Sequence, residues 1–326
     1  MTKLSKNRTR LLEAIRDLRV ADLEVLTALL ASEREPGRHA FGAWGVRRAC
    51  EALLEQGLLH RLWKFRDPKF RINRGSARQV FLLSGKGAVV LGSPAVRAER
   101  WFEYLKDPRK EYVLEHELMI ARFHAALLRA QQVRPDLLTL IAWEQGEGTE
   151  IKGEGVRIRP DAFFVMRSEA VRLRWNVFLE ADTGNERIES RDSKRRTIEK
   201  KIRRYGEADA KEVVQRQFEV SRFSVLFMSP RRSDPSALSG RESSILSAIQ
   251  RHGRINEHAL NFYRVVSETA IIEALQNPER LFEEVVTHGN GRAYPIIALP
   301  ASLKALAGSS SSSIPSQELP PTHEAP

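Results

Sequence analysis

The chain is poor in cysteine, and this shortage excludes several classes of protein. Its 326 residues include one cysteine, Cys50, so an internal disulfide framework and a zinc site built from several cysteines are both excluded. Cys50 falls on the apolar side of an expected helix, and we therefore expect a small core side chain rather than a reactive thiol. A single reduced thiol fits a protein of the reducing cytoplasm, which is the location that we expect.

Long apolar runs and an excess of acidic residues are also missing. No run approaches the roughly 18 apolar residues of a membrane-spanning helix, and the N-terminus has no long apolar leader segment. The chain has 42 acidic against 53 basic residues and a net charge of +11. Such a field favours a polyanion, either nucleic acid or an anionic membrane surface. Because the sequence has no membrane segment, we expect double-stranded DNA as the partner and do not expect binding to a membrane.

The first 93 residues have the pattern of three helices followed by a hairpin. Apolar residues recur at helical spacing over 7–19, 21–31 and 42–56. Strands are expected at 58–65 and 79–83, with a Gly-Ser turn between them. This order is typical of a winged helix-turn-helix, so residues 1–93 are predicted to form a DNA-binding domain of that kind.

Basic residues gather where a winged helix touches DNA. The third helix is expected in the major groove and the hairpin, which has a single acid, on flanking phosphates. The predicted DNA-binding residues are Arg47, Arg48, Arg61, Lys64, Arg66, Lys69, Arg71 and Arg74. The alternative is a winged helix that mediates protein contacts and carries a merely solvated hairpin.

A helical linker is predicted over 94–111, and a second domain over 112–300. A mostly buried helix at 112–131 is followed by expected strands at 137–143, 159–165 and 177–181, with a turn at 146–155, a helix at 191–206 and a strand at 223–228. A helix at 241–252, an edge strand at 262–266 and a helix near 268–276 complete the domain. This order is that of the PD-(D/E)xK nuclease core, a mixed sheet of the α+β or α/β class. Residues 301–326, rich in serine and proline, are predicted to be disordered.

Carboxylates stand at the ends of two expected strands. Asp161 begins one strand and Glu180 ends another, so the fold can bring both acids to one point, where they repel unless a cation or proton lies between them. Mg²⁺ or Mn²⁺ suits such oxygen ligands, and Glu117 on the preceding helix is a candidate third ligand. The ion would polarise a phosphate and lower the pKa of a bound water. In the alternative, the acids pair with arginines such as Arg157, Arg159 or Arg195.

Four short motifs occur in a characteristic order. They are Leu114-Glu115-His116-Glu117, Arg159-Pro160-Asp161-Ala162, Leu179-Glu180-Ala181-Asp182, and Lys201 with Tyr205. Over roughly residues 10–290 the chain resembles the replication-relaxation family. The resemblance implies a protein of plasmids or other mobile elements, linked to replication and DNA relaxation. A relaxase or a replication initiator is the protein partner that it suggests.

A lysine normally follows two positions after the strand-end acid in the PD-(D/E)xK superfamily, and here that position is Asp182. Lys201 is the candidate substitute, because it emerges beside Ile202 and Tyr205, which should pack on the sheet. Its ammonium would position the attacking water. In the alternative, Lys201 spreads its methylenes over the core and pairs with Asp182. Residues expected to support the site are His116, Asp182 and Tyr205.

Three functions are compatible with this pattern. The leading one is a DNA-binding protein of a plasmid or mobile element that acts in replication, relaxation or transfer. The second is an active Mg²⁺-dependent endonuclease or nickase that uses Asp161, Glu180 and Lys201. The third is a transcriptional regulator with a non-catalytic nuclease-like domain. Helix-turn-helix proteins are often dimers, so a homodimer is a possible state.

Overall fold

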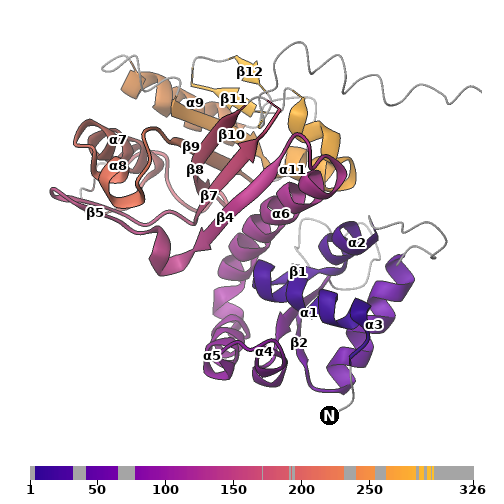
Figure 1. The fold of residues 1–326 in the computed structure, drawn as a ribbon. Helices are drawn as coiled ribbons and strands as arrows, with labels where there is room; N and C mark the ends of the chain where they lie inside the picture. The colour runs from indigo at the N-terminus through magenta and orange to yellow at the C-terminus, as the bar shows by residue number, and fades with distance from the viewer. Residues whose placement is uncertain are drawn as a thin grey trace, which may run out of the picture.

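The computed structural model describes residues 4–31, 42–64, 78–170, 172–190, 192, 195–230, 240–253, 262–283, 286–289, 292–294 and 296. These residues form a mixed α+β fold (Figure 1). The predicted tail, 301–326, lies outside them. None of the helices described is long and apolar enough to cross a membrane.

The N-terminal module contains helices on one side of a small antiparallel sheet. Its elements are α1 (Lys6–Leu18), β1 (Ala21–Asp22), α2 (Leu23–Ala31), α3 (Ala43–Glu55), β2 (Leu59–Lys64) and β3 (Arg78–Leu83). The strand order is β1-β3-β2, with both pairs antiparallel. Asp22 caps α2, because its carboxylate accepts a hydrogen bond from the Val25 amide at 2.9 Å. The three expected helices and two strands are confirmed within a few residues, and Cys50 is buried as expected.

The segment after β3 is mostly helical and packs on the module. It contains α4 (Gly85–Val90), α5 (Ala95–Leu105) and the short 3-10 turn η2 (Pro108–Lys110). Phe102 of α5 stacks on His60 of β2 with ring centroids 3.9 Å apart, and the Glu99 carboxylate lies 3.0 Å from the same histidine. The segment predicted as a linker therefore holds a helix that is fixed against β2.

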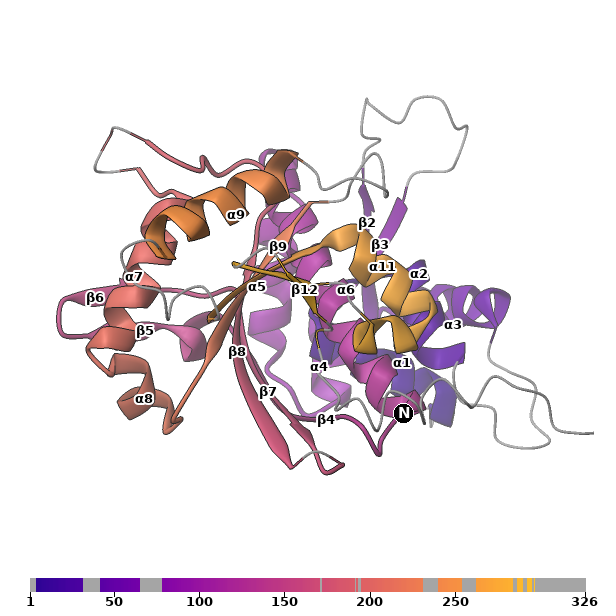
Figure 2. The same ribbon diagram turned by 90° about the horizontal axis from the view of Figure 1, so that it is seen from above.

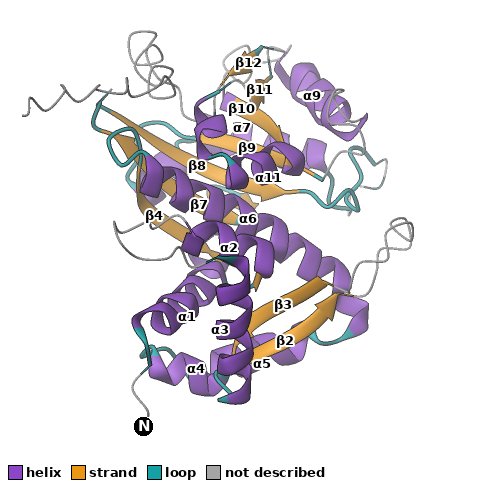
Figure 3. Ribbon diagram, turned by 90° about the vertical axis from the view of Figure 1, so that its right-hand side faces the viewer, coloured by secondary structure: helices purple, strands orange, loops and turns teal. Residues whose placement is uncertain are grey.

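A long helix, α6 (Glu111–Val133), lies between the N-terminal module and the large sheet (Figures 1 and 3). Its expected burial is confirmed along most of its length. Arg122 on this helix bonds to Asp22 of the module at 3.1 Å and also to Glu268, which directly follows strand β10 (Tyr263–Ser267) of the large sheet. All three side chains are buried, so a charged contact inside the core ties the two parts together.

The large sheet contains strands β4 (Thr139–Gln145), β7 (Ala162–Ser168), β8 (Leu173–Ala181), β9 (Ser224–Ser229), β10 (Tyr263–Ser267), β11 (Val286–His288) and β12 (Ala293–Tyr294). Their order is β12-β11-β10-β9-β8-β7-β4. Strands β8, β9 and β10 are parallel, and the other neighbours are antiparallel. A separate hairpin of β5 (Ile151–Gly153) and β6 (Val156–Ile158) follows the turn η3 (Gly146–Thr149).

Helices cover both faces of this sheet, and Figure 2 shows the two layers from above. One face carries α7 (Ile198–Ala210), α8 (Val213–Phe218) and α9 (Gly240–Gly253), and the other carries α6, α11 (Glu268–Gln276) and η4 (Pro278–Phe282). Side chains alternate between the faces as they must on a strand. Phe163 and Phe178 join the core beneath α7, whereas Phe164 and Leu179 join the core that continues through α6 into the N-terminal module.

Several expected boundaries in the second domain are wrong. The strand expected from 159 begins at Ala162, after Pro160, which has no N–H to give to a ladder. The helix expected over 191–206 begins at Ile198, because the Thr197 side chain caps it by accepting from the Lys200 amide at 3.2 Å. The turn expected at 146–155 includes strand β5.

The strand predicted at 262–266 is confirmed as Tyr263–Ser267, but its predicted position at the edge of the sheet is wrong. Strand β10 lies inside the sheet, parallel to β9 on one side and antiparallel to β11 on the other. The strand that covers it, β11, is only Val286–His288. So short a strand has too little hydrophobic pattern to be recognised in the sequence.

Candidate functional site

Two acids meet at one end of strands β7 and β8. The Asp161 amide donates to the Leu179 carbonyl at 3.0 Å, and the Asp161 carboxylate accepts from the Ala181 amide at 2.7 Å. These bonds hold Asp161 beside Glu180. Glu180 shares the alternation of Phe178, so its side chain lies on the face of the sheet that α7 covers. The chain therefore brings these two acids together at one end of the sheet.

Lys201 and Tyr205 reach the same place from α7. Lys201 Nζ lies 2.9 Å from the Glu180 carboxylate and 2.8 Å from that of Glu186. The Tyr205 hydroxyl donates to Glu180 Oε1 at 2.7 Å. Lys201 and Tyr205 are four residues apart and so project from the same side of the helix. Because Thr197 fixes the start of α7, it also fixes the height at which both side chains meet Glu180.

His116 completes the group from α6. Its Nε2 lies 3.1 Å from Asp161 Oδ2, with both side chains about a quarter exposed or less. We call the six residues His116, Asp161, Glu180, Glu186, Lys201 and Tyr205 the acidic cluster. The next residue on α6, Glu117, is buried, and its Oε2 lies 3.5 Å from Arg19 Nη1. Glu117 thus borders the cluster but pairs with the N-terminal module.

The two central acids have opposite pKa shifts. Burial raises the pKa of Glu180 to about 7, against the lowering effect of Lys201 and with a further rise from Asp161. Burial alone would also raise the pKa of Asp161, but the charges of His116 and Lys201 hold it below its usual value. Near neutral pH Asp161 is therefore ionised, while Glu180 can gain or lose a proton.

The neighbouring groups respond to this negative charge. Burial would lower the pKa of His116, but Asp161 outweighs it and the pKa is raised. The pKa of Lys201 is raised because Glu180 and Asp161 more than offset its burial. Burial raises the pKa of Tyr205, and Glu180 raises it further. Tyr205 therefore stays a hydrogen-bond donor to Glu180, and Lys201 stays a cation.

The alternative pairings through Arg157, Arg195 and Asp182 are wrong, and no contact of the described residues tests the pairing through Arg159. Arg157 lies 2.7 Å from Glu150, and Arg195 lies 3.7 Å from Asp192, so neither arginine neutralises Asp161 or Glu180. Asp182 does not pair with Lys201 either. Its carboxylate accepts from Arg241 Nη2 of α9 at 3.0 Å and from the Gly184 amide at 2.9 Å. Asp182 therefore shapes the turn that follows β8, and Lys201 is left to the two glutamates.

Sequence reasoning missed the role of Glu186 as the second partner of Lys201. Gly184 adopts a φ of +84°, which turns the chain after β8 back towards α7. The signal was the Thr-Gly-Asn-Glu run after the strand, where a turn could be expected but not its direction. Arg19 and Arg241 were also missed, because each meets its acid across long stretches of sequence.

The donor set partly fits a divalent cation. Within the described residues no three His, Cys, Asp or Glu side chains lie together so that they could hold a metal ion, and Glu117 does not complete such a group. Asp161 and Glu180 offer two carboxylates, and Mg²⁺ is commonly held by one or two, with waters and substrate phosphates completing its shell. Glu180 Oε2 is buried without a hydrogen bond and faces the Lys201 ammonium. These two acids would hold the ion.

The predicted DNA-binding residues are only partly described. Arg47 and Arg48 are exposed on α3, and the Arg48 guanidinium lies 5.2 Å from the Trp44 ring. Arg61 pairs with Glu51 of α3 at 2.9 Å, which offsets its charge. Lys64 ends β2, and its side chain is outside the description. The residues that lie wholly outside the described part are Arg66, Lys69, Arg71 and Arg74.

Fold and site together define an α+β protein in which a small helical module is joined by a buried helix to a mixed sheet with an acidic cluster at one end. The family model for replication-relaxation matches residues 12–220, a stretch that includes the whole cluster. Because the match spans more than half of the chain, this protein belongs to the replication-relaxation family. Neither the curated proteins nor the solved structures include a match. The family points to a role in the replication or relaxation of plasmids or mobile elements.

Proposed function

We propose that this chain is a DNA-binding protein of a plasmid or mobile element that acts in replication, relaxation or transfer. The observation that carries the proposal is the convergence of Asp161, Glu180 and Lys201 from three separate elements at one end of the sheet. Next to them, α7 exposes Arg203 and Arg204 to solvent, where they can meet phosphates. A phosphodiester is the substrate that this combination of acids and cations suits best.

A winged helix is our interpretation of the N-terminal module. The order α1-β1-α2-α3-β2-β3 with a β1-β3-β2 sheet supports it. In that arrangement α3 is the recognition helix, and its exposed Arg47 and Arg48 would face the major groove. Double-stranded DNA is therefore the partner that we propose for this module.

A PD-(D/E)xK-like core is our interpretation of the large sheet. The order α6-β4-β7-β8-α7-β9 supports it, with β4, β7 and β8 antiparallel and β9 parallel to β8. Asp161 and Glu180 stand at the positions of the two acids of that core. Lys201 brings from α7 the ammonium that would otherwise follow Glu180 on its strand.

Active Mg²⁺-dependent cleavage or nicking of DNA is the second candidate, favoured by the contact between Lys201 and Glu180. A bound Mg²⁺ or Mn²⁺ would polarise the phosphate and acidify a water. In this role Tyr205 orients the Glu180 carboxylate, and Lys201 offsets the charge that develops on the phosphate oxygens. Glu180, with a pKa of about 7, can accept or return a proton near neutral pH.

The decisive experiment uses the full chain and supercoiled plasmid DNA. We expect a mobility shift in EDTA, and nicked circles only after Mg²⁺ is added. Glu180→Gln should bind DNA as the wild type does but leave the plasmid supercoiled, whereas the matched change Glu207→Gln on the exposed side of α7 should nick normally. Binding without nicking under all conditions would leave a binding protein without catalysis.

DNA contact by α3 is tested separately. Arg47→Gln with Arg48→Gln removes two cations from the DNA interface, so the slope of log binding constant against log salt concentration should become shallower by about 1.8. The control pair Arg174→Gln with Arg222→Gln removes the same charge from the sheet domain and should leave the slope unchanged. Equal slopes for both pairs would overturn α3 as the DNA-reading helix.

A relaxase or a replication initiator is the protein partner that we propose for this role. The homodimer is tested by light scattering of the purified chain with and without a bound duplex. A transcriptional regulator would be the outcome if Glu180→Gln and Lys201→Met variants bound DNA and supported plasmid replication as well as the wild type.

A further inference from the structure

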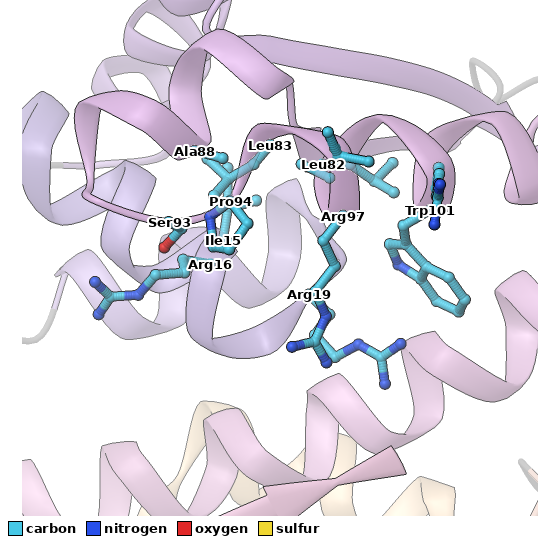
Figure 4. A pocket seen from close by; sticks show the side chains of 13 residues that line it. Ile15, Arg16, Arg19, Leu82, Leu83, Ala88, Ser93, Pro94, Arg97 and Trp101 are labelled. Carbon is cyan, nitrogen blue, oxygen red and sulfur yellow. The ribbon is translucent and has the colours of Figure 1, made fainter. Parts of the chain in front are cut away.

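A cavity of about 680 Å³ opens between α1, β3, α4 and α5 (Figure 4). Its floor is apolar and includes Leu83, Val96, Ala98 and the ring of Trp101, with Ile15 and Leu82 almost completely buried. A volume of this size is typical of sites for small molecules, which are concave, largely apolar and supplied with a few polar groups. The cavity is separate from the acidic cluster, because none of the residues that line the cavity belongs to that cluster.

Guanidinium groups surround this floor, and no carboxylate residue lines the cavity. The arginines are Arg16, Arg19, Arg97 and Arg100. Arg16 bonds to the adjacent Asp17 at 2.7 Å, and the Arg19 guanidinium lies 4.4 Å from the centre of the Trp101 ring. In Figure 4, Arg19 and Arg97 extend towards each other, while Arg16 points away.

Two of these cations have no carboxylate partner among the residues that the structure describes. They are Arg97 and Arg100, which are exposed on α5. Arg97 extends towards Arg19 in Figure 4, and an anion between two such like charges removes their repulsion. A guanidinium also holds a phosphate or carboxylate through paired hydrogen bonds. The rim of the cavity is therefore complementary to an anionic group.

We propose that this cavity binds a small amphipathic anion. Its apolar chain or ring would lie on Val96, Ala98 and Trp101, and its phosphate or carboxylate would be held by Arg97 and Arg100. DNA is a poor occupant, because the floor is apolar and the cavity lies on the side of α1 away from α3 (Figures 1 and 2). The site stands independently of the proposed function.

The test is calorimetric titration of the full chain with octyl phosphate below its micelle-forming concentration. We expect saturable binding of one molecule per chain. Octanol has only the apolar chain and inorganic phosphate has only the anionic group. Each should bind at least about tenfold more weakly than octyl phosphate. Octanoate in place of octyl phosphate distinguishes a carboxylate ligand from a phosphate ligand, because the tighter of the two identifies the preferred head group.

Two variants test the place of binding. Arg97→Gln with Arg100→Gln should weaken octyl phosphate binding about tenfold or more, whereas the equally charged control Arg174→Gln with Arg222→Gln should bind as the wild type does. Ala98→Trp fills the cavity without a change of charge and should abolish binding, with the fold checked by circular dichroism. The proposal is overturned if the wild type shows no saturable binding up to about 1 mM. It is equally overturned if the cavity variants bind as tightly as the control.

Discussion

Lys201 Nζ lies 2.9 Å from Glu180 Oε2, with the lysine side chain 26% exposed and the glutamate side chain 1% exposed. The pair therefore stands at the border between core and solvent, where attraction between charges is stronger than in bulk water. The carboxylate loses nearly all of its hydration, while the ammonium keeps part of its own. This asymmetry explains why the pKa of Glu180 is raised even though a cation touches it.

The raised pKa of Glu180 makes stability depend on pH. Burial raises it from 4.5 to about 7, so the native chain keeps a proton that the unfolded chain has released. The resulting stabilisation is complete below the unfolded pKa and is lost as pH rises through about 7. The Glu180→Gln side chain cannot ionise. The difference in unfolding free energy, wild type minus variant, should therefore decrease as the pH rises from about 5 to about 8. Urea unfolding followed by circular dichroism measures it, and a difference that grows with pH would contradict the assignment.

Removal of the cation should lower the unfolding free energy most when Glu180 is ionised, because the pair with Glu180 is then lost in addition to the pair with Glu186. We expect Lys201→Met to lower the unfolding free energy by about 2 kcal/mol at about pH 8, less than for a fully buried pair because Lys201 is partly exposed. At about pH 5 the loss should shrink, since Glu180 is then protonated. Lys200→Met, which removes a neighbouring lysine whose ammonium donates to the Asp192 and Arg195 carbonyls, is the matched control. Equal losses for both variants at both pH values would refute a charge effect.

Arg122 is the buried cation between Asp22 and Glu268, whose side chains are 1% and 8% exposed. Replacement by methionine leaves two buried carboxylates without their cation, and we expect a loss of about 3 to 5 kcal/mol in denaturant unfolding. Arg129→Met on the same helix loses a bond to the Ala28 carbonyl and should cost about 1 kcal/mol. Glu268→Gln added to Arg122→Met should restore part of the loss. A loss for Arg122→Met no larger than that for Arg129→Met would show that the network contributes little.

Burial raises the pKa of the Cys50 thiol to about 12, so very little thiolate exists near neutral pH. We expect a thiol reagent to modify the native chain very slowly at about pH 8 and the urea-unfolded chain at the rate of a free thiol. The labelling rate across a urea series then reports opening of the N-terminal module. Rapid labelling of the native chain would mean that α3 is not packed as described.

Local patterns predicted the fold well where hydrophobic spacing is strong. The helix at α6 and the strands β7, β8 and β9 have continuous apolar patterns, so their existence follows from periodicity. The start of α7 depended on the side chain of Thr197, and the placement of β10 on the three-residue strand β11. The Thr197 cap is a local signal that the helical pattern alone overlooks, since its partner is the Lys200 amide three residues on. Strand pairing over long distances is a tertiary fact, and no single segment contains it.

The candidate site was predictable only in part for a similar reason. Asp161 and Glu180 could be found because strand ends from one sheet converge, and Lys201 because a helix periodicity places it beside Tyr205. The partners of the charged groups could not be found. Arg241 reaches Asp182 from α9, and Arg19 reaches Glu117 from α1, and only the folded chain makes either pair neighbours.

The apolar core that runs without a break from α1 through α6 to β8 has a mechanical consequence. Because Arg122 also pairs with Asp22 and with Glu268, the N-terminal module and the large sheet are held in a fixed relative position. Under the proposed function, a duplex bound by α3 would therefore reach Asp161 and Glu180 at a constant distance from the bases that α3 contacts. Any strand break would lie a set number of base pairs from the sequence that is read, whatever the bases between.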